Sequence, residues 1–170
     1  MTLHNLQLAI LGVLASDPWM TLKKIETLAE DRGDVYTALK TAVSKIGLCV
    51  VVNTPGINCD QPDGFIPVGI SNVVITCFES PLFTRGKANR TTALNAAERV
   101  ACLLTGRVEL IGGHGEEFGV PSFVKIESGA TGGNATEALI FYNVHFRVRA
   151  ALSGGMAEYP PESTPKHPNL

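Results

Sequence analysis

Two histidines, His114 and His145, are the residues best suited to catalysis or metal binding. His114 lies in the segment Gly-Gly-His-Gly-Glu-Glu, where a metal site would need at least two further ligands at a workable spacing. A solvated polar turn is the simpler interpretation. His145 is followed by Arg147 and Arg149, and no motif places a serine or cysteine nucleophile beside it. A small hydrolase using either histidine stays open as an alternative, but the sequence predicts a protein that is not an enzyme.

Carboxylates and thiols add little to a catalytic interpretation. Asp60, Asp63 and Glu79 could gather in space, but aspartates are common in turns, which explains the first two. No Cys-x-x-Cys spacing links the cysteines, so packed core thiols are favoured over a disulfide or a metal site. Cys59 is the exception, because it is predicted to lie in a loop. We therefore expect no catalytic residue, no metal and no cofactor. The four cysteines are Cys49, Cys59, Cys77 and Cys102.

The elements that would hold these residues include at least four strands. Hydrophobic patterns predict them over residues 48–53, 73–79, 122–127 and 140–151, and the second of them has an alternative start at Val68. Glycine-rich and proline-containing segments between the strands are interpreted as hairpin connections, among them Pro55–Gly64 and Gly129–Thr136.

The segment 140–151 gives the clearest pattern, because apolar and polar residues alternate strictly along it. Such alternation is typical of a strand with one buried face and one face open to solvent or a partner. The polar face is a candidate interface for a neighbouring subunit or another protein. It comprises Asn143, His145, Arg147 and Arg149, opposite Ile140, Tyr142, Val144, Phe146, Val148 and Ala150.

Helices are predicted at the N-terminus and in the middle of the chain. Residues 3–46 are interpreted as two or three helical pieces, although the short apolar run 3–14 does not distinguish a helix from a strand. One helix is expected to begin at Asp17-Pro18 and another to end at Gly47. The first of these would bury Leu22, Ile25, Leu28 and Ala29, and a further helix over 92–104 would bury Leu94, Ala97, Val100, Ala101 and Leu104.

A basic turn precedes the helix at 92–104. It carries Arg85, Lys87 and Arg90, which are candidates for contact with DNA or with an acidic partner. A turn that is merely solvated explains the same residues equally well.

Composition indicates one ordered domain over residues 1–152. The 170 residues are 45% hydrophobic and 18% charged, which is enough for one core. A net charge of -2 gives no reason to expect a membrane surface or sequence-specific nucleic acid binding. Residues 153–170 hold four prolines and few apolar side chains, so they are interpreted as an extended or disordered arm. We see no signal peptide and expect synthesis in the cytoplasm.

The order of these elements resembles that of small tail proteins of long-tailed bacteriophages, in the tail terminator and tail completion group. The likeness rests on Lys45–Val52, on Val74–Pro81, on the Asn89-Arg90 turn with the following Thr92–Val100, and on the long last strand. It covers about residues 3–151, and its motifs are diffuse patterns of strand, turn and helix without a catalytic signature.

The resemblance implies an α+β fold in which helices pack on one face of a mixed or largely antiparallel sheet of about four or more strands. It also implies a structural virion protein, a homohexameric ring at the head-proximal end of a tail that ends the tail tube and joins it to the neck. Its partners would be itself, the tail tube protein and a neck or head-completion protein, with DNA passing through the lumen. A neck connector or baseplate component of the same particle is the alternative role.

Overall fold

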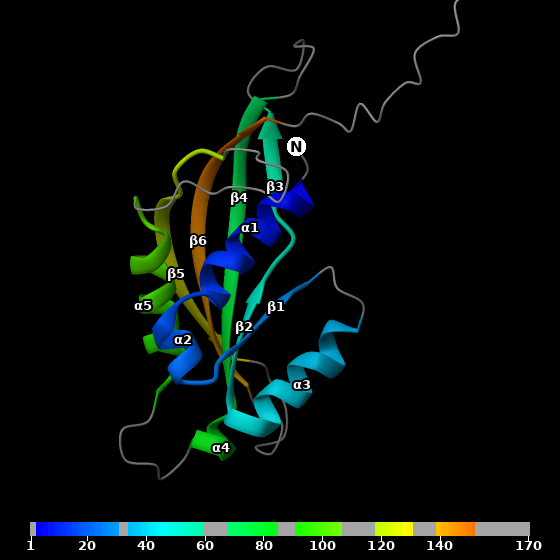
Figure 1. Cartoon of the computed structure of the whole chain (residues 1–170), viewed down its shortest axis with the longest axis vertical. Coiled ribbons are helices and arrows are strands. Elements are labelled where there is room, and N and C mark those ends of the chain that lie inside the picture. The colour runs from blue at the N-terminus through cyan, green and yellow to red at the C-terminus, as the bar shows by residue number, and fades with distance from the viewer. Residues whose placement is uncertain are drawn as a thin grey trace, which may run out of the picture.

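The computed structural model describes residues 3–30, 34–59, 68–84, 91–106, 118–130 and 139–151. Within these ranges lie five helices and one mixed sheet of six strands (Figure 1). The helices are α1 (Leu3–Ala15), α2 (Pro18–Leu22), α3 (Val35–Ile46), α4 (Pro81–Thr84) and α5 (Ala93–Leu104). The strands are β1 (Glu26–Ala29), β2 (Leu48–Val52), β3 (Gly56–Cys59), β4 (Val68–Glu79), β5 (Ser122–Ala130) and β6 (Ile140–Ala151).

The strand order is β1-β2-β4-β6-β5, and β3 also pairs with β4. The β1–β2 pair is parallel, and the other pairs are antiparallel. The predicted α+β class with helices packed against a mixed sheet is confirmed. All four predicted strands are present, with β4 beginning at Val68 and β5 extending to Ala130.

The ladder between β4 and β6 is the longest in the sheet and runs from the pair Val68–Ala151 to the pair Glu79–Ile140. On its inner side, Val73 and Ile75 of β4 and Val144 and Phe146 of β6 are almost completely buried. Because side chains alternate along a strand, this register fixes which residues of both strands point into the core and which point away.

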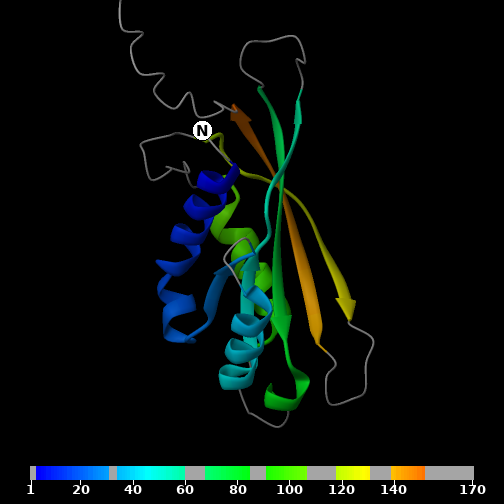
Figure 2. The ribbon, with the colours of Figure 1, turned by 90° about the vertical axis from the view of Figure 1, so that its right-hand side faces the viewer.

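Helices contact both faces of the sheet around β2, whose five residues are all buried. Val50 and Val52 belong to the larger core, which α1, α2 and α5 cover, whereas Cys49 and Val51 pack toward α3. Figure 2 shows α1 and α5 together on one side of the sheet. The expected arrangement of helices on one face thus holds for α1, α2 and α5, and α3 adds a helix to the opposite face.

The ends of two helices follow from local chemistry. Residues 3–15 form a helix, which settles the ambiguity of the first apolar run. Asp34 caps α3 by accepting a hydrogen bond from the backbone N–H of Thr37. Gly47 ends α3 in a left-handed conformation with φ of 82°, which glycine adopts without steric cost.

The prediction of a long helix from Asp17-Pro18 through Ala29 is wrong. Asp17 does cap α2, but this helix ends at Leu22, and Lys24 takes a positive φ of 54° that turns the chain into β1. Residues 26–29 then pair in parallel with β2. The predicted buried residue Leu22 is exposed. Pairing with β2 is a tertiary contact that a local helical pattern does not report.

The segment after β2 also differs from its interpretation as a simple hairpin connection. Residues 56–59 form β3, which pairs with the first half of β4, while β2 pairs with the second half. The two short strands therefore lie end to end along one side of β4, with a break at Asn53–Pro55. The backbone N–H of Asn53 still donates to the carbonyl of Val74 across this break, at 3.0 Å.

Helix α5 begins close to the start predicted for the segment 92–104. Thr92 is its N-cap, and Asn95 completes a capping box. The buried carboxylate of Glu79, at the end of β4, accepts a hydrogen bond of 2.9 Å from the backbone N–H of Ala93. A negative side chain at this position offsets the positive end of the helix dipole. The buried face differs in two predicted residues, because Leu94 is 38% exposed and Ala101 is only partly buried. The buried set is Ala93, Ala96, Ala97, Val100 and Leu104.

Two thiols behave as core groups, and one does not. Burial raises the pKa of the Cys49 thiol to about 12 and raises the pKa of Cys77 as well, so neither is ionised at neutral pH. Cys102 is exposed on α5, which corrects its interpretation as a core residue.

In the described part of the chain, no helix is long and apolar enough to cross a membrane.

Replacing Val100 with Asp should prevent folding. The Val100 side chain is completely buried, and an unpaired carboxylate there would cost several kcal/mol or more, a large part of the total stability of a small domain. We expect Val100→Asp protein to be insoluble, or to lack a cooperative thermal transition by circular dichroism.

Leu94→Asp on the same helix is the matched control. Leu94 is partly exposed and lies in the first turn of α5, where a carboxylate is favourable. It should change the free energy of unfolding by no more than about 1 kcal/mol. A cooperatively melting Val100→Asp protein would contradict this packing of α5.

Asp17 and Arg99 link α2 to α5 through an ion pair that predicts a pH dependence. Arg99 donates two hydrogen bonds, at 3.1 and 2.6 Å, to the buried Asp17 carboxylate, which also caps α2 at Met20. The hydrogen bonds from Arg99 lower the pKa of Asp17 against the opposing effect of burial. A lowered folded-state pKa stabilises the fold above the ordinary aspartate pKa, and this stabilisation is lost as the pH falls through the folded-state value.

Arg99→Met should therefore lower the free energy of unfolding at pH 7 by about 1–3 kcal/mol. The difference from the wild type should shrink below about pH 4, where the unfolded chain's aspartate is protonated. Urea unfolding at several pH values measures this, with Lys125→Met as a control that breaks a solvent-exposed ion pair. A difference for Arg99→Met that is the same at pH 7 and pH 3 would disprove the coupling.

Candidate interaction site

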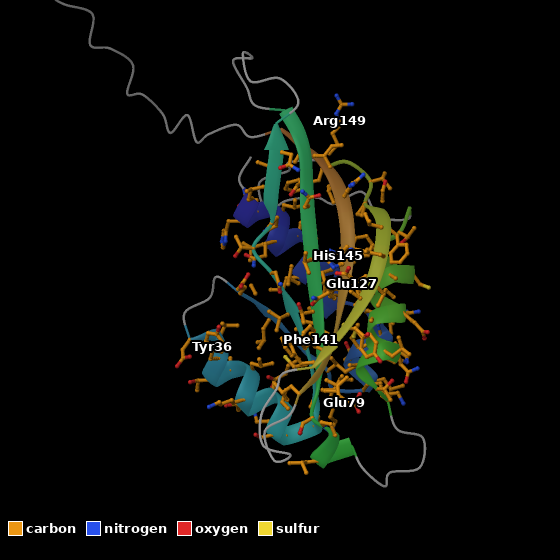
Figure 3. The ribbon with its side chains drawn as sticks, turned by 180° about the vertical axis from the view of Figure 1, so that it is seen from behind. Tyr36, Glu79, Glu127, Phe141, His145 and Arg149 are labelled. Carbon is orange, nitrogen blue, oxygen red and sulfur yellow. The ribbon has the colours of Figure 1, made fainter. Side chains whose placement is uncertain are left out.

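The polar side of β6 lies on the face of the sheet that carries α3, which we call the outer face. Figure 3 views this face and shows Phe141, His145 and Arg149 in succession along the strand. The buried residues of β6 are Val144, Phe146, Val148 and Ala150, in the predicted alternation. The four predicted interface residues Asn143, His145, Arg147 and Arg149 thus share one side of β6, but their surroundings differ.

Asn143 is part of a hydrogen-bonded row across the middle of the sheet. The hydroxyl of Thr76 on β4 donates to Asn143 Oδ1 at 2.9 Å and lies 3.3 Å from Asn53 Oδ1. Thr76 is buried and Asn143 is half-buried. These side chains satisfy one another, so Asn143 contributes to the sheet itself more than to a free surface.

His145 lies beside two charged residues of β5. Its Nε2 atom lies 3.1 Å from Glu127 Oε2, and Lys125 also bonds to the Glu127 carboxylate. The hydrogen bond from Lys125 lowers the pKa of Glu127, and the adjacent His145 acts in the same direction. A carboxylate can orient an imidazole, as it does beside the nucleophile of many hydrolases. Neither Glu127 nor Lys125, however, supplies a hydroxyl or thiol nucleophile for His145 to activate.

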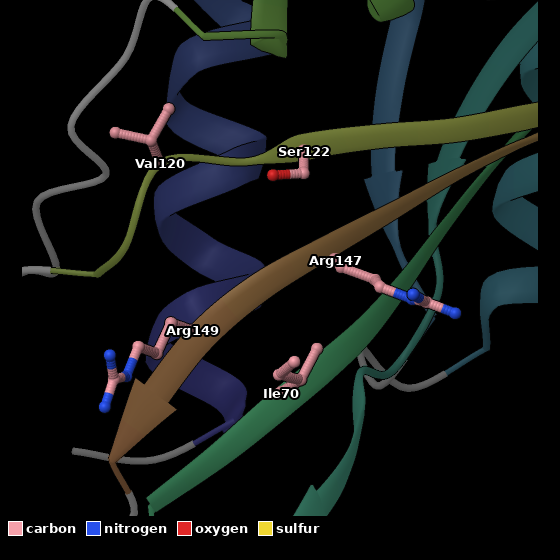
Figure 4. A pocket seen from close by; sticks show the side chains of 5 residues that line it. All are labelled: Ile70, Val120, Ser122, Arg147 and Arg149. Atoms are coloured by element: carbon pink, nitrogen blue, oxygen red, sulfur yellow. The ribbon is translucent and has the colours of Figure 1, made fainter.

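Arg147 and Arg149 are exposed and line a shallow hollow with a volume of about 510 Å³. Figure 4 shows their side chains extending to either side of Ile70 on β4. Val120 and Ser122, at the start of β5, complete the lining. The hollow therefore combines two arginines with two exposed aliphatic side chains, because Ile70 and Val120 are 38% and 50% exposed. This combination suits an acidic segment that also carries apolar groups.

The hollow has its shape because Gly119 packs directly on β6. The backbone N–H of Gly119 donates to the carbonyl of Arg149 at 3.0 Å. A Cβ at Gly119 would lie 2.9 Å from Arg149 Cβ and 3.1 Å from the Arg149 carbonyl oxygen, closer than normal contacts allow. Glycine at this position lets the chain entering β5 lie close against the end of β6 and places Val120 at the edge of the hollow.

Sequence reasoning found the β6 residues of this surface but missed its other contributors, Ile70, Val120, Ser122, Lys125 and Glu127. A β-bulge between Phe123 and Lys125 explains part of the failure. The extra residue shifts the alternation, so Phe123 and Val124 are both partly exposed and no two-residue period marks the strand. The pattern Lys125, Glu127 is the one signal that could have indicated an outward charged face.

Several predicted residues lie outside the described part of the chain. These are the candidate carboxylates Asp60 and Asp63, the basic turn residues Arg85, Lys87 and Arg90, the alternative catalytic residue His114, and the whole segment 153–170. They stay predictions.

A second hollow, of about 460 Å³, lies between α2 and α5, where Trp19, Lys23, Glu98 and the exposed Cys102 are among the lining residues. The side chains there are mixed in charge and do not converge on one group. Within the described ranges, no group of three or more His, Cys, Asp and Glu side chains could hold a metal ion. The described residues thus define an α+β protein whose most distinctive surface is a charged strand face.

Comparison with known proteins agrees at the level of the fold. No family model matches the sequence, and no curated protein matches it. Among solved structures, the chain is similar to a chain of the "Virion of native gene transfer agent (GTA) particle", with a TM-score of 0.60 and 17% sequence identity. The match covers 86% of this chain and 95% of that chain. At this identity, the similarity is one of fold.

Gly119→Ala should destabilise the protein by about 1–3 kcal/mol, because the added methyl group meets the β6 backbone and threatens the hydrogen bond to Arg149. Gly12→Ala is the matched control, since nothing lies within 4 Å of a Cβ there and the residue is inside α1. It should stabilise the protein by about 0.5–1 kcal/mol. Chemical denaturation measures both, and equal behaviour of the two variants would disprove the close approach at Gly119.

Proposed function

We propose that this protein is a structural component of a phage-like virion, located in the tail. More specifically, we propose a homohexameric ring at the head-proximal end of the tail that ends the tail tube and joins it to the neck. The observation that supports a virion role is the fold similarity to a chain of a gene transfer agent particle, which extends over nearly the whole length of both chains. The tail and ring assignments rest on the sequence resemblance to tail terminator proteins.

The surfaces of the molecule are compatible with such a ring. A closed ring uses two different surfaces on each subunit, because each contact joins one face of a subunit to another face of the next. The outer face of β6 offers one surface, with exposed Arg147 and Arg149. Strand β5 offers another, because it ends the strand order and exposes Phe123 and Val124. The tail tube and neck proteins would contact the two ends of the ring.

The role is proposed to be non-enzymatic. His145 is held next to Glu127 and Lys125, which are all on the outer face of the sheet. That arrangement explains the residue as part of a charged surface. A neck connector or baseplate component would use the same kinds of surface, so the position in the particle has to be decided by experiment.

Electron microscopy of the purified protein tests the proposal most directly. We expect rings with a central channel wide enough for DNA, and sixfold symmetry in class averages. Gold labelling of particles should place the protein where the tail meets the neck. Compact monomers at all concentrations would contradict the ring, and label at the distal end of the tail would favour the baseplate alternative.

Reversing both charges in the variant Arg147→Glu/Arg149→Glu should leave the monomer folded, because both side chains are exposed. It should weaken ring or tube association at least tenfold, because charge-assisted contacts of arginine are common in interfaces. The matched control is Lys23→Glu/Lys40→Glu, which makes the same change of charge at exposed positions just after α2 and within α3. Light scattering and tail length in particles measure the effect, and normal assembly by the β6 variant would exclude this surface.

A further inference from the structure

The hollow on the outer face lies beside the point where the chain leaves the sheet. Strand β6 ends at Ala151, two residues after Arg149, and the chain continues for the nineteen residues 152–170. Within this continuation, residues 158–162 read Glu-Tyr-Pro-Pro-Glu, which we call the acidic segment. Two glycines, Gly154 and Gly155, separate it from β6.

We propose that the hollow binds the acidic segment of the same chain, which reverses direction at Gly154-Gly155 and lies back over the outer face of β6. The partner for Arg147 and Arg149 in the isolated protein is then an intramolecular one. This proposal is independent of the virion role, because it concerns the folded chain before any assembly.

The spacing along the two segments supports this arrangement. Extended and polyproline chains both advance by about 3.1–3.4 Å per residue. A reversal at Gly154-Gly155 therefore returns Glu158 to the level of residues 149–151 and Glu162 to the level of residues 145–147. Tyr159 returns to the level of the Ile70–Arg149 pair, where β4 and β6 are in register.

The chemistry of the hollow matches the segment. Glu158 and Glu162 carry charges opposite to those of Arg147 and Arg149. The Tyr159 ring and the two prolines can cover the exposed Ile70 and Val120. Prolines cannot donate backbone hydrogen bonds to a sheet, and β6 already pairs on both sides with β4 and β5. The segment would thus lie on the face of the sheet through its side chains, without extending the ladder.

The occupant is assigned to the same chain because a short covalent connection gives it a high effective concentration. Linkers of a few residues produce effective concentrations of about the millimolar range, far above that of a free neighbour in dilute solution. Glycine can adopt the conformations that a tight reversal requires at no steric cost, and two glycines stand at this point of the sequence. Individually weak exposed ion pairs can then hold the segment in place.

The proposal has a consequence for assembly. A partner that uses Arg147 and Arg149 must first displace the acidic segment, so the chain competes with its own partners for this surface. Neutralising the segment in Glu158→Gln/Glu162→Gln should strengthen association, whereas reversing the two arginines should weaken it. Because the two variants should change the strength of association in opposite directions, their comparison distinguishes this competition from the direct role of the arginines in the ring.

Fluorine NMR of the full-length protein labelled with 3-fluorotyrosine tests the binding itself. The chain has three tyrosines, and Tyr159→Phe identifies the signal of Tyr159. We expect this signal to differ in shift and linewidth from that of a free peptide of residues 156–164. It should move to the free-peptide position in Arg147→Glu/Arg149→Glu, and in about 1 M salt, where the screening length falls to about 3 Å. The control Lys23→Glu/Lys40→Glu should leave it in place.

Dilution with unlabelled protein identifies the chain that supplies the segment. Labelled wild-type protein is dissociated and refolded with a tenfold excess of unlabelled Arg147→Glu/Arg149→Glu protein. If each chain binds its own segment, the Tyr159 signal keeps its bound position. A move to the free position would assign the hollow to a neighbour's segment, and a free signal in the undiluted wild type would show an empty hollow. Either result would overturn the proposal.

Discussion

The register between β4 and β6 is the constraint on which the rest of the structure depends. It places Val73, Ile75, Val144 and Phe146 together on the inner side, where α1 and α5 close the core. A shift by one residue would turn these apolar side chains outward and bury the arginines of β6. Thr76 and Asn143 are opposite each other in this register, and their hydrogen bond at 2.9 Å exists in no neighbouring alignment. The burial pattern and the polar row therefore favour the same pairing.

Sequence reasoning succeeded where one local signal decides the structure. The strict alternation of 140–151 gave the correct buried side of β6, and Gly47 marked the end of α3 through its left-handed geometry. It failed where a distant partner decides. Residues 26–29 form a strand because β2 lies beside them, and residues 56–59 form one because β4 does. The hollow was missed for the same reason, since Ile70 and Val120 come from segments far from β6 in the sequence.

The outer face of β6 changes in character along its length. Near its middle, Asn143 and His145 are held by Thr76 and Glu127, so their polar groups serve the cohesion of the sheet. Toward its end, Arg147 and Arg149 line the hollow beside aliphatic side chains. One uniform polar stripe in the sequence thus becomes two regions in the structure. The region around Asn143 and His145 stabilises the strand order, and the region around Arg147 and Arg149 is the part left for binding.

The long ladder also has a consequence for how the protein reaches its native state. Strands β4 and β6 are separated in the sequence by α5 and β5, so the pairing has a high contact order and is expected to form slowly. During synthesis at about 5–20 residues per second, β4 emerges several seconds before β6. In that interval the valine- and isoleucine-rich residues 73–77 lack their main partner strand. A cell that makes this protein in quantity would need chaperones that cover this strand until β6 has been synthesised, to keep nascent chains from pairing with one another.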